Sequence, residues 1–103
     1  MPPKFGASSR EPAHNTYALV GGSASIHCSP TGAPKPHIRW RKKTSGEELR
    51  GRPRFTVESS GTLLIHDVRQ EDEGTYQCIA SNEHGTATKE GMLTVSGEER
   101  FNL

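Results

Sequence analysis

Cys28 and Cys78 are the only cysteines in this sequence, and their thiols are the side chains best suited to redox or metal chemistry. Fifty positions separate them (78 − 28), and neither lies in a C-x-x-C motif. Two cysteines alone cannot complete a tetrahedral zinc site, and a thioredoxin-type redox centre needs the closely spaced pair that is missing here. Metal and thioredoxin-type chemistry are therefore not expected at either cysteine.

Histidine and serine side chains are the other candidates for chemistry, since together with an aspartate they form hydrolytic triads. The chain has five histidines: His14, His27, His37, His66 and His84. The sequence lacks a G-x-S-x-G elbow, an H-E-x-x-H pair and a glycine-rich phosphate loop, and its Gly21-Gly22 pair precedes a predicted strand rather than a helix. No catalytic residue, metal ligand or cofactor is predicted.

Basic residues gather in the middle of the chain. Between Lys35 and Arg54 there are eight cationic residues and only two acidic ones, Glu47 and Glu48. The candidate basic patch consists of Arg39, Arg41, Lys42, Lys43, Arg50 and Arg52. Clustered cations bind polyanions such as heparan sulfate, or an acidic face of another domain, and release counterions in doing so. Charges also keep exposed strands from pairing with other sheets, so both roles stay open.

The composition limits the molecule to one small domain. The chain has 103 residues, a formal net charge of +1 and 30% apolar residues, and a domain of this size is marginally stable unless it is cross-linked. The balanced charge argues against a dedicated nucleic-acid or polybasic membrane binder. Apolar runs are four residues or shorter, against the roughly 20 needed to cross a bilayer. The first residues do not resemble a secretory signal, and we interpret the chain as a segment of a longer protein.

Short segments of alternating polarity, separated by Gly, Pro, Ser and Thr, predict strands with one buried face. Ala24, Ile26 and Cys28 share a face of one such segment. Further strands are predicted around Ile38–Trp40, Arg54–Glu58, Leu63–Ile65, Tyr76–Ala80 and Thr86–Val95, with a first strand at Tyr17–Leu19 that pairs with the last. Ala87 and Lys89 fall on the same face of the last strand if the alternation is unbroken, which makes the register uncertain and suggests a bulge. Seven to eight strands at regular spacing predict an all-β sandwich or barrel.

Three motifs carry a resemblance to a known family. Cys28, Trp40 and Cys78 follow one another in the order Cys, Trp, Cys; residues 72–78 read D-x-G-x-Y-x-C; and residues 61–65 read G-T-L-x-I. Together they resemble the immunoglobulin superfamily, in particular its I-set type, over residues 3–95. The resemblance implies an all-β fold, a Greek-key sandwich of two antiparallel sheets.

The same resemblance implies roles for single residues. Cys28 and Cys78 would form a disulfide between the sheets, which for a loop of about 50 residues is worth about 4 kcal/mol. Trp40, Leu63 and Tyr76 would belong to the core, the Tyr76 phenol binding backbone a few residues upstream. The structural core and ion-pair residues implied in this way are Trp40, Leu63, Tyr76, Arg54 and Asp72. In cytosolic filament proteins of this family the two cysteines can remain thiols, so their redox state stays open.

His27 and His66 point outward from strands that are neighbours in the family's sheet. They could form a weak metal-binding or pH-sensitive pair, or be two ordinary surface histidines, which is the interpretation we prefer.

We divide the chain into residues 1–9, a start or linker with a first strand; residues 10–96, a single I-set domain; and residues 97–103, a linker or flexible tail. The sequence of residues 74–85 is similar to the corresponding sequences of neural adhesion molecules and receptors of the contactin and L1 kind. This similarity implies an extracellular, non-enzymatic module that binds proteins and spaces domains in a cell-surface adhesion protein or receptor.

Its partners would be other proteins, through homophilic or heterophilic contact, and neighbouring immunoglobulin domains. Heparan sulfate is a further candidate partner, nucleic acid is not expected, and a membrane is reached only through the parent chain. Two alternatives remain: a structural module of a cytosolic sarcomeric filament, and a polyanion-binding accessory domain of the extracellular matrix. The turn at residues 31–36 and the hairpin at residues 82–85 are expected at one end of the sandwich, where the chain enters from a preceding domain.

Overall fold

Within residues 1–4 and 14–97, which the computed structural model describes, the chain forms seven strands and one short 3-10 helix. Their bounds are β1 (His14–Leu19), β2 (Ala24–Ile26), β3 (His37–Lys42), β4 (Phe55–Val57), β5 (Leu63–Ile65), the 3-10 helix η2 (Gln70–Asp72), β6 (Gly74–Asn82) and β7 (Gly85–Ser96). The predicted domain boundary near residue 10 and all but the first residue of the predicted tail at 97–103 lie outside the described residues.

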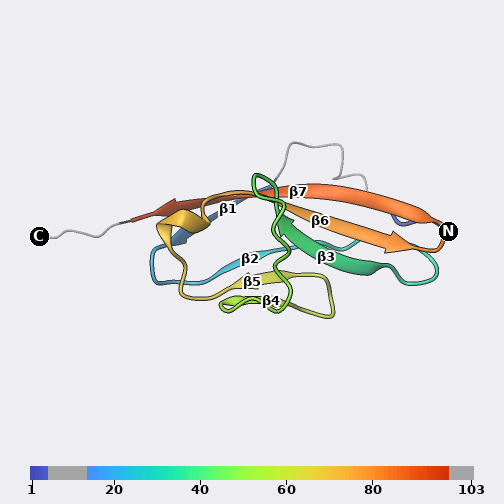
Figure 1. Ribbon diagram of the computed structural model, residues 1–103, viewed down its shortest axis with the longest axis horizontal. Coiled ribbons are helices and arrows are strands. Elements are labelled where there is room, and N and C mark those ends of the chain that lie inside the picture. The colour runs from blue at the N-terminus through green and yellow to red at the C-terminus, as the bar shows by residue number, and fades with distance from the viewer. Residues whose placement is uncertain (5–13, 98–103) are drawn as a thin grey trace, which may run out of the picture.

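The strands form two sheets that face each other across the core (Figure 1). One sheet has the order β1-β7-β6-β3 and the other the order β2-β5-β4. The prediction of an all-β, two-sheet immunoglobulin-like sandwich is confirmed. One pairing departs from the antiparallel pattern, because β1 runs parallel to β7 with Tyr17 opposite Thr94. The predicted pairing of the first strand with the last is thereby confirmed.

The core lies between the sheets and is built by the period-two alternation of the strands. Trp40, Leu63 and Tyr76 are each at most 1% exposed. Ala24 and Ile26 of β2 are buried on either side of the half-buried Ser25. The other buried apolar residues of this cluster are Cys28, Leu49, Ile65, Val68, Cys78, Leu93 and Val95. The two sheets thus share one apolar interior.

The β6–β7 hairpin is longer than the rest of the sheet and keeps one register from Gly74 opposite Leu93 to Asn82 opposite Gly85. The predicted bulge near Ala87 is therefore wrong. At the hairpin tip, the Asn82 side-chain amide donates to the carbonyls of Met1 (2.8 Å) and Pro34 (2.9 Å). These bonds confirm that the turn at residues 31–36 and the hairpin lie at the same end of the sandwich.

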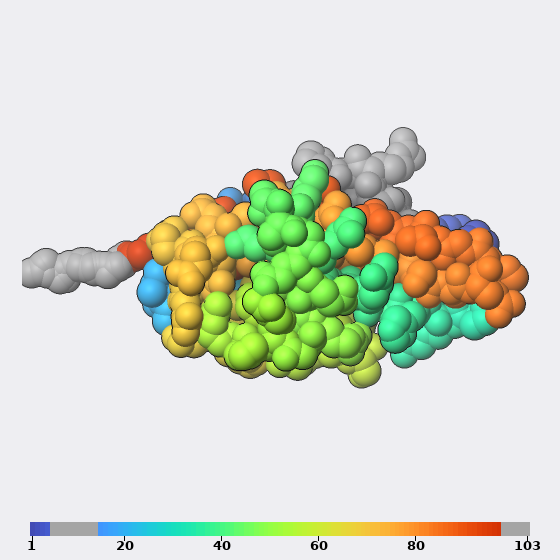
Figure 2. Space-filling view, in the orientation of Figure 1, coloured from blue at the N-terminus to red at the C-terminus, as the bar shows by residue number. Residues whose placement is uncertain are grey.

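The segment between β3 and β4 lies across the open side of the sandwich (green, Figure 2). It follows the free edge of β3: the Lys42 amide donates to the Glu47 carbonyl at 3.1 Å, and the Leu49 amide donates to the Trp40 carbonyl at 3.0 Å. The buried Leu49 side chain then anchors the segment to the core. The edge of β3 is consequently covered by the chain's own backbone.

Candidate interaction surfaces

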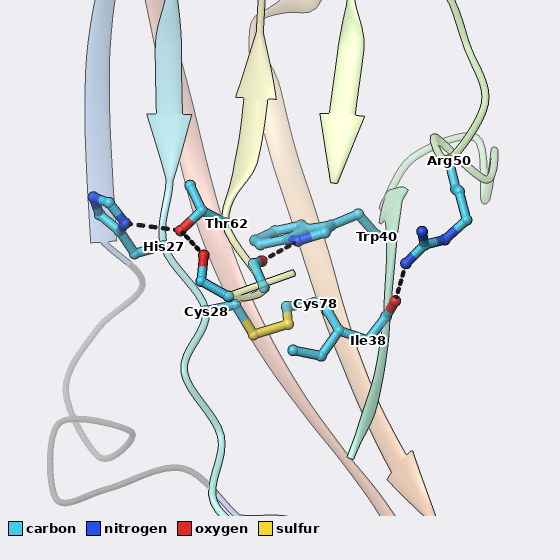
Figure 3. The surroundings of a disulfide bond; sticks show 9 residues. His27, Cys28, Ile38, Trp40, Arg50, Thr62 and Cys78 are labelled. Carbon is cyan, nitrogen blue, oxygen red and sulfur yellow. Dashed lines mark hydrogen bonds between the residues drawn. A yellow bond between two sulfur atoms is a disulfide. The ribbon is translucent and has the colours of Figure 1, made fainter. Parts of the chain in front are cut away.

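The centre of the sandwich holds Cys28 and Cys78, which are joined by a disulfide with their Cα atoms 6.5 Å apart. Trp40 lies directly opposite Cys78 in the β3–β6 register, with its ring beside the sulfur atoms (Figure 3). Its indole N–H donates to the Gly61 carbonyl at 2.8 Å, so the buried polar group of the ring is satisfied. The expected Cys, Trp, Cys arrangement is brought together, and it ties the two sheets to each other.

A clamp of charged and polar groups closes the end of the sandwich near η2. The Arg54 guanidinium makes two parallel hydrogen bonds to the Asp72 carboxylate, at 2.8 and 3.0 Å. The Arg69 amide also donates to this carboxylate, at 2.8 Å. The Tyr76 hydroxyl donates to the Asp72 carbonyl at 2.5 Å. The structure thus places the predicted ion pair and the predicted tyrosine contact on one residue, Asp72.

The clamp also sets the protonation of its members. Burial alone would raise the pKa of Asp72, but the hydrogen bonds from Arg54 and the Arg69 amide outweigh it, so that pKa lies below its ordinary value. Burial strongly raises the pKa of the Tyr76 phenol. At neutral pH the clamp therefore combines an ionised Asp72 with a neutral Tyr76 that donates its proton in a hydrogen bond.

The six residues of the predicted basic patch lie on β3 and the segment after it, and each has a partner. Three form ion pairs: Arg39 with Glu48 at 3.8 Å, Lys43 with Glu90 at 2.7 Å, and Arg52 with Glu47. The other three donate hydrogen bonds: Arg41 to Gln77 at 2.7 Å, Lys42 to the Glu71 carbonyl at 2.6 Å, and Arg50 to the Ile38 carbonyl at 2.9 Å. Polyanion binding by this patch stays a prediction.

A polar ladder on the outer face of the four-stranded sheet was not predicted. Arg41, Gln77 and Glu90 lie opposite one another on β3, β6 and β7. The Gln77 amide donates to the Glu90 carboxylate at 3.3 Å, and Lys43 completes the ladder through its ion pair with Glu90. The hydrogen bond from Lys43 lowers the pKa of Glu90. Only the registers between three strands bring these residues together, which is why no single segment of sequence signalled them.

The hypothesis that His27 and His66 form a pair is wrong. Because β2 and β5 are antiparallel with Ile26 opposite Leu63, His27 falls opposite Thr62 at the other end of the strand pair from His66. The separation of four residues corresponds to about 13 Å. The His27 ring instead makes a 3.2 Å hydrogen bond with the Thr62 hydroxyl. In residues 1–4 and 14–97, no group of three or more His, Cys, Asp or Glu is placed to hold a metal ion.

Apolar side chains are exposed on β1 and β7, at the edge opposite the basic patch. Tyr17 and Leu19 of β1 are exposed, as are Val20, which follows this strand, and Met92 of β7. Sequence alternation placed Tyr17 and Leu19 on a strand but did not reveal that their side chains face solvent. Among the described residues no helix is long and apolar enough to cross a bilayer.

Comparisons with known proteins agree with this architecture. The family model of the immunoglobulin I-set domain matches residues 7–95. Contactin-2 of Rattus norvegicus is 43% identical over 86 residues, which cover 84% of this chain and 8% of contactin-2. Hemicentin-2 of Mus musculus is 42% identical over 77 residues, covering 75% of this chain and 2% of the relative. The chain therefore spans less than a tenth of the length of these curated relatives.

Solved structures with the same fold include domains of Sidekick-1 and of a titin-containing complex. Immunoglobulin domains 1–4 of Sidekick-1 superpose with a TM-score of 0.78 at 35% identity, over 92% of this chain and 24% of that one. A chain of the titin M10–obscurin-like 1 immunoglobulin complex superposes with a TM-score of 0.80 at 26% identity, over 96% and 98% of the two chains. Because the family model spans nearly all of the two-sheet sandwich, the chain belongs to the immunoglobulin I-set domain family.

Proposed function

We propose that this chain is a non-enzymatic module that binds proteins and spaces domains within a long cell-surface adhesion protein or receptor. The observation that carries the proposal is its 43% identity to contactin-2 over 84% of its own length and only 8% of the relative's. A unit that corresponds to so small a part of a relative acts alongside other domains. In this proposal residues 10–96 are the folded module, and the flanking residues connect it to its neighbours.

Exposed side chains on β1 and β3 are available for protein contact, because Tyr17 and Leu19 face solvent and the Arg39 side chain is 47% exposed. The contacts of a single module of this size are expected to be weak, and several modules in one chain raise the overall affinity through avidity. Its partners in the proposal are proteins, bound homophilically or heterophilically, and adjacent immunoglobulin domains. The Asn82 contacts bring Met1 and Pro34 to the hairpin end of the sandwich, which the proposal assigns to contact with an adjacent domain.

The experiment that tests this function uses beads densely coated with the chain. Beads that cluster with one another, or that attach to the surface of neuronal cells, would support adhesion by this module. Beads coated with reduced and alkylated chain are the control, because they present the same sequence without its fold. If the folded chain neither clusters beads nor attaches them to cells more than this control does, the adhesion proposal is wrong.

A second candidate is a structural module of a cytosolic sarcomeric filament. It is favoured by the superposition with one chain of the titin-containing complex, which covers nearly the full length of this chain and of that one. The two candidates differ in the redox state of Cys28 and Cys78, because extracellular proteins keep disulfides and cytosolic ones are reduced. The test is to alkylate the protein, denatured without reductant, after recovery from its native cell. Zero modified thiols support the extracellular proposal, and two support the filament module.

A third candidate is a matrix module that binds polyanions such as heparan sulfate. The observation in its favour is the gathering of six cationic side chains on β3 and the segment after it. A variant with Arg39, Arg41, Lys42 and Lys43 all changed to Ser tests this role on a heparin column. Elution at lower salt than the original chain would support polyanion binding, and unchanged elution would reject it.

A further inference from the structure

An uncharged, apolar strip runs along one edge of the four-stranded sheet. Five large apolar side chains of the described residues are exposed, and four of them belong to this strip. They are Tyr17 (72% exposed), Leu19 (65%), Val20 (48%) and Met92 (41%). The parallel register sets Asn15 beside Met92 and Tyr17 beside Thr94, so the side chains of Tyr17, Leu19 and Met92 share one face, and Val20 follows at the end of β1. A group of exposed apolar side chains of this kind is typical of an interaction site.

Among the described residues, the outer backbone edge of this strip has no paired strand. β1 is the outermost strand of its sheet, and among the described residues it pairs only with β7. The Val20 amide donates to the Ser96 carbonyl. Since the amides of successive residues point to opposite sides of a strand, those of Asn15, Tyr17 and Leu19 point away from β7. The Leu19 carbonyl accepts from the Gly22 amide at 2.9 Å. Among the described residues, the amides of Asn15, Tyr17 and Leu19 and the carbonyls of Asn15 and Tyr17 remain available for a further strand.

The opposite edge of the same sheet shows how this protein closes an edge. There, β3 is covered by backbone hydrogen bonds from the following segment, and the Arg50 side chain binds the Ile38 carbonyl. Its outer face carries the positive charges of Arg39 and Arg41. β1, His-Asn-Thr-Tyr-Ala-Leu, is six residues long and contains neither Pro nor any Lys, Arg, Asp or Glu. It lacks the devices that normally prevent strand addition.

From these observations we propose that β1 is the contact through which a second copy of this chain binds. The two β1 strands pair antiparallel about a two-fold axis at Tyr17. This sets each Asn15 opposite Leu19 of the other copy and joins the two sheets into one. The inference rests on the proposed adhesive function and assigns its homophilic contact to one surface.

A second copy fits this edge better than a charged partner does. In a two-fold interface each residue meets the same patch on the other molecule, so charges on the patch would face like charges. The β1 strip has none, whereas two copies meeting through β3 would bring their cations together. The tyrosines on the axis would also lie side by side, as cross-strand aromatic pairs do. The paired segment is short, so the contact is weak for one domain and gains strength when many copies are displayed together.

Sedimentation equilibrium up to about 1 mM protein tests the contact. The original chain is expected to show a mass that rises with concentration toward that of a dimer. Tyr17→Lys places a charge on each copy at the axis, and is expected to weaken dimerisation at least tenfold. Thr56→Lys makes the matched change on β4, at the edge of the other sheet, and should leave dimerisation unchanged. A monomer throughout, or equal effects of both variants, would overturn the proposal.

A cross-linking experiment tests the register directly. Both cysteines of the chain are held in the disulfide, so Tyr17→Cys introduces a single reactive thiol. Directly opposed residues of antiparallel strands have Cα atoms about 5 Å apart, which suits a disulfide. Under mild oxidation the Tyr17→Cys chain should form covalent dimers at least ten times faster than Thr56→Cys. Equal rates would reject the two-fold axis at Tyr17.

The bead assay separates this inference from the proposed function. If Tyr17→Lys beads stop clustering while their attachment to cells persists, the second-copy contact is supported. If Tyr17→Lys beads cluster as strongly as the original ones, adhesion stands but its surface is not β1, and this inference is wrong.

Discussion

Arg54 and Asp72 are joined by two parallel hydrogen bonds across eighteen residues of chain, and Arg54 holds its backbone in the left-handed region, at φ 73°, while it makes them. Few residues other than glycine adopt that conformation without cost. The Arg54 guanidinium also donates to the Asp67 carbonyl at 3.0 Å. The contacts of one side chain therefore hold together β4, the turn after β5 and η2, and they offset the backbone strain at Arg54.

Replacing Asp72 with Asn is expected to lower the free energy of unfolding by about 3 kcal/mol, because it leaves a partly buried guanidinium without its charge partner. The Asp72 side chain is 5% exposed and that of Arg54 is 19% exposed. Urea denaturation of the two proteins measures the difference. Glu48→Gln is the matched control, since it breaks the exposed pair with Arg39 and should cost less than about 1 kcal/mol. Similar losses for both variants would contradict a special role for the clamp.

The same pair predicts how stability changes with acid. The pKa of Asp72 is lowered in the folded protein, so below its ordinary value of 3.8 the unfolded chain binds the proton more readily. Its stabilising effect is therefore complete above about pH 5 and is lost as the pH falls through the lowered pKa. In urea titrations at a series of pH values, the advantage of the original chain over Asp72→Asn should be constant from pH 5 to 8 and shrink below pH 4. An advantage that does not change down to pH 2 would exclude this linkage.

The clamp was implied by the resemblance to the immunoglobulin superfamily, whereas the polar ladder was not predicted. Asp72 and Tyr76 lie in a short motif that carries the resemblance, and the same resemblance implied Arg54 as the partner of Asp72. The ladder of Arg41, Gln77 and Glu90 depends on two strand registers at once. A register shift of one residue moves every side chain to the other face, so alternation alone could not align three strands.

The alternative pairing of His27 and His66 failed for the same reason. The preferred interpretation, two separate surface histidines, agrees with their exposure, and alternation does not tell which ends of β2 and β5 meet. The exposed apolar edge of β1 escaped prediction because the residues of an edge strand look the same in sequence whether or not another strand covers them. The core residues were easier to predict. Trp40 and Leu63 occupy inward-facing positions of alternating strands, and both strands belong to the sandwich.

Removing the disulfide should destabilise the domain strongly. A double change of Cys28 and Cys78 to Ala is expected to lower the free energy of unfolding by about 4 kcal/mol, because the cross-link closes a loop of about 50 residues in the unfolded chain. That loss is a large part of the stability of a small domain. Thermal unfolding followed by circular dichroism measures it. If the double variant unfolds within a few degrees of the original chain, the disulfide is not a main source of stability.

The sharpest steric prediction concerns Gly61, which has a φ of 103° and lies against the Cys28 backbone. A Cβ atom there would lie 2.3 Å from the Cys28 carbonyl oxygen and 2.6 Å from the Ile38 side chain, and the Gly61 carbonyl also accepts the Trp40 hydrogen bond. Gly61→Ala must therefore push backbone apart in the core, and we expect it to cost at least about 3 kcal/mol.

Gly46→Ala provides the control for this prediction, because Gly46 also has a positive φ (70°), but a Cβ atom added there would meet no other described residue within 4 Å. It isolates the cost of the backbone conformation, about 1 kcal/mol. Urea denaturation of both variants, with Trp40 fluorescence as the signal, compares them. A loss for Gly61→Ala no larger than for Gly46→Ala would mean that the loop at Gly61 relaxes freely, and that the contact between Trp40, Gly61 and the disulfide is not tightly packed.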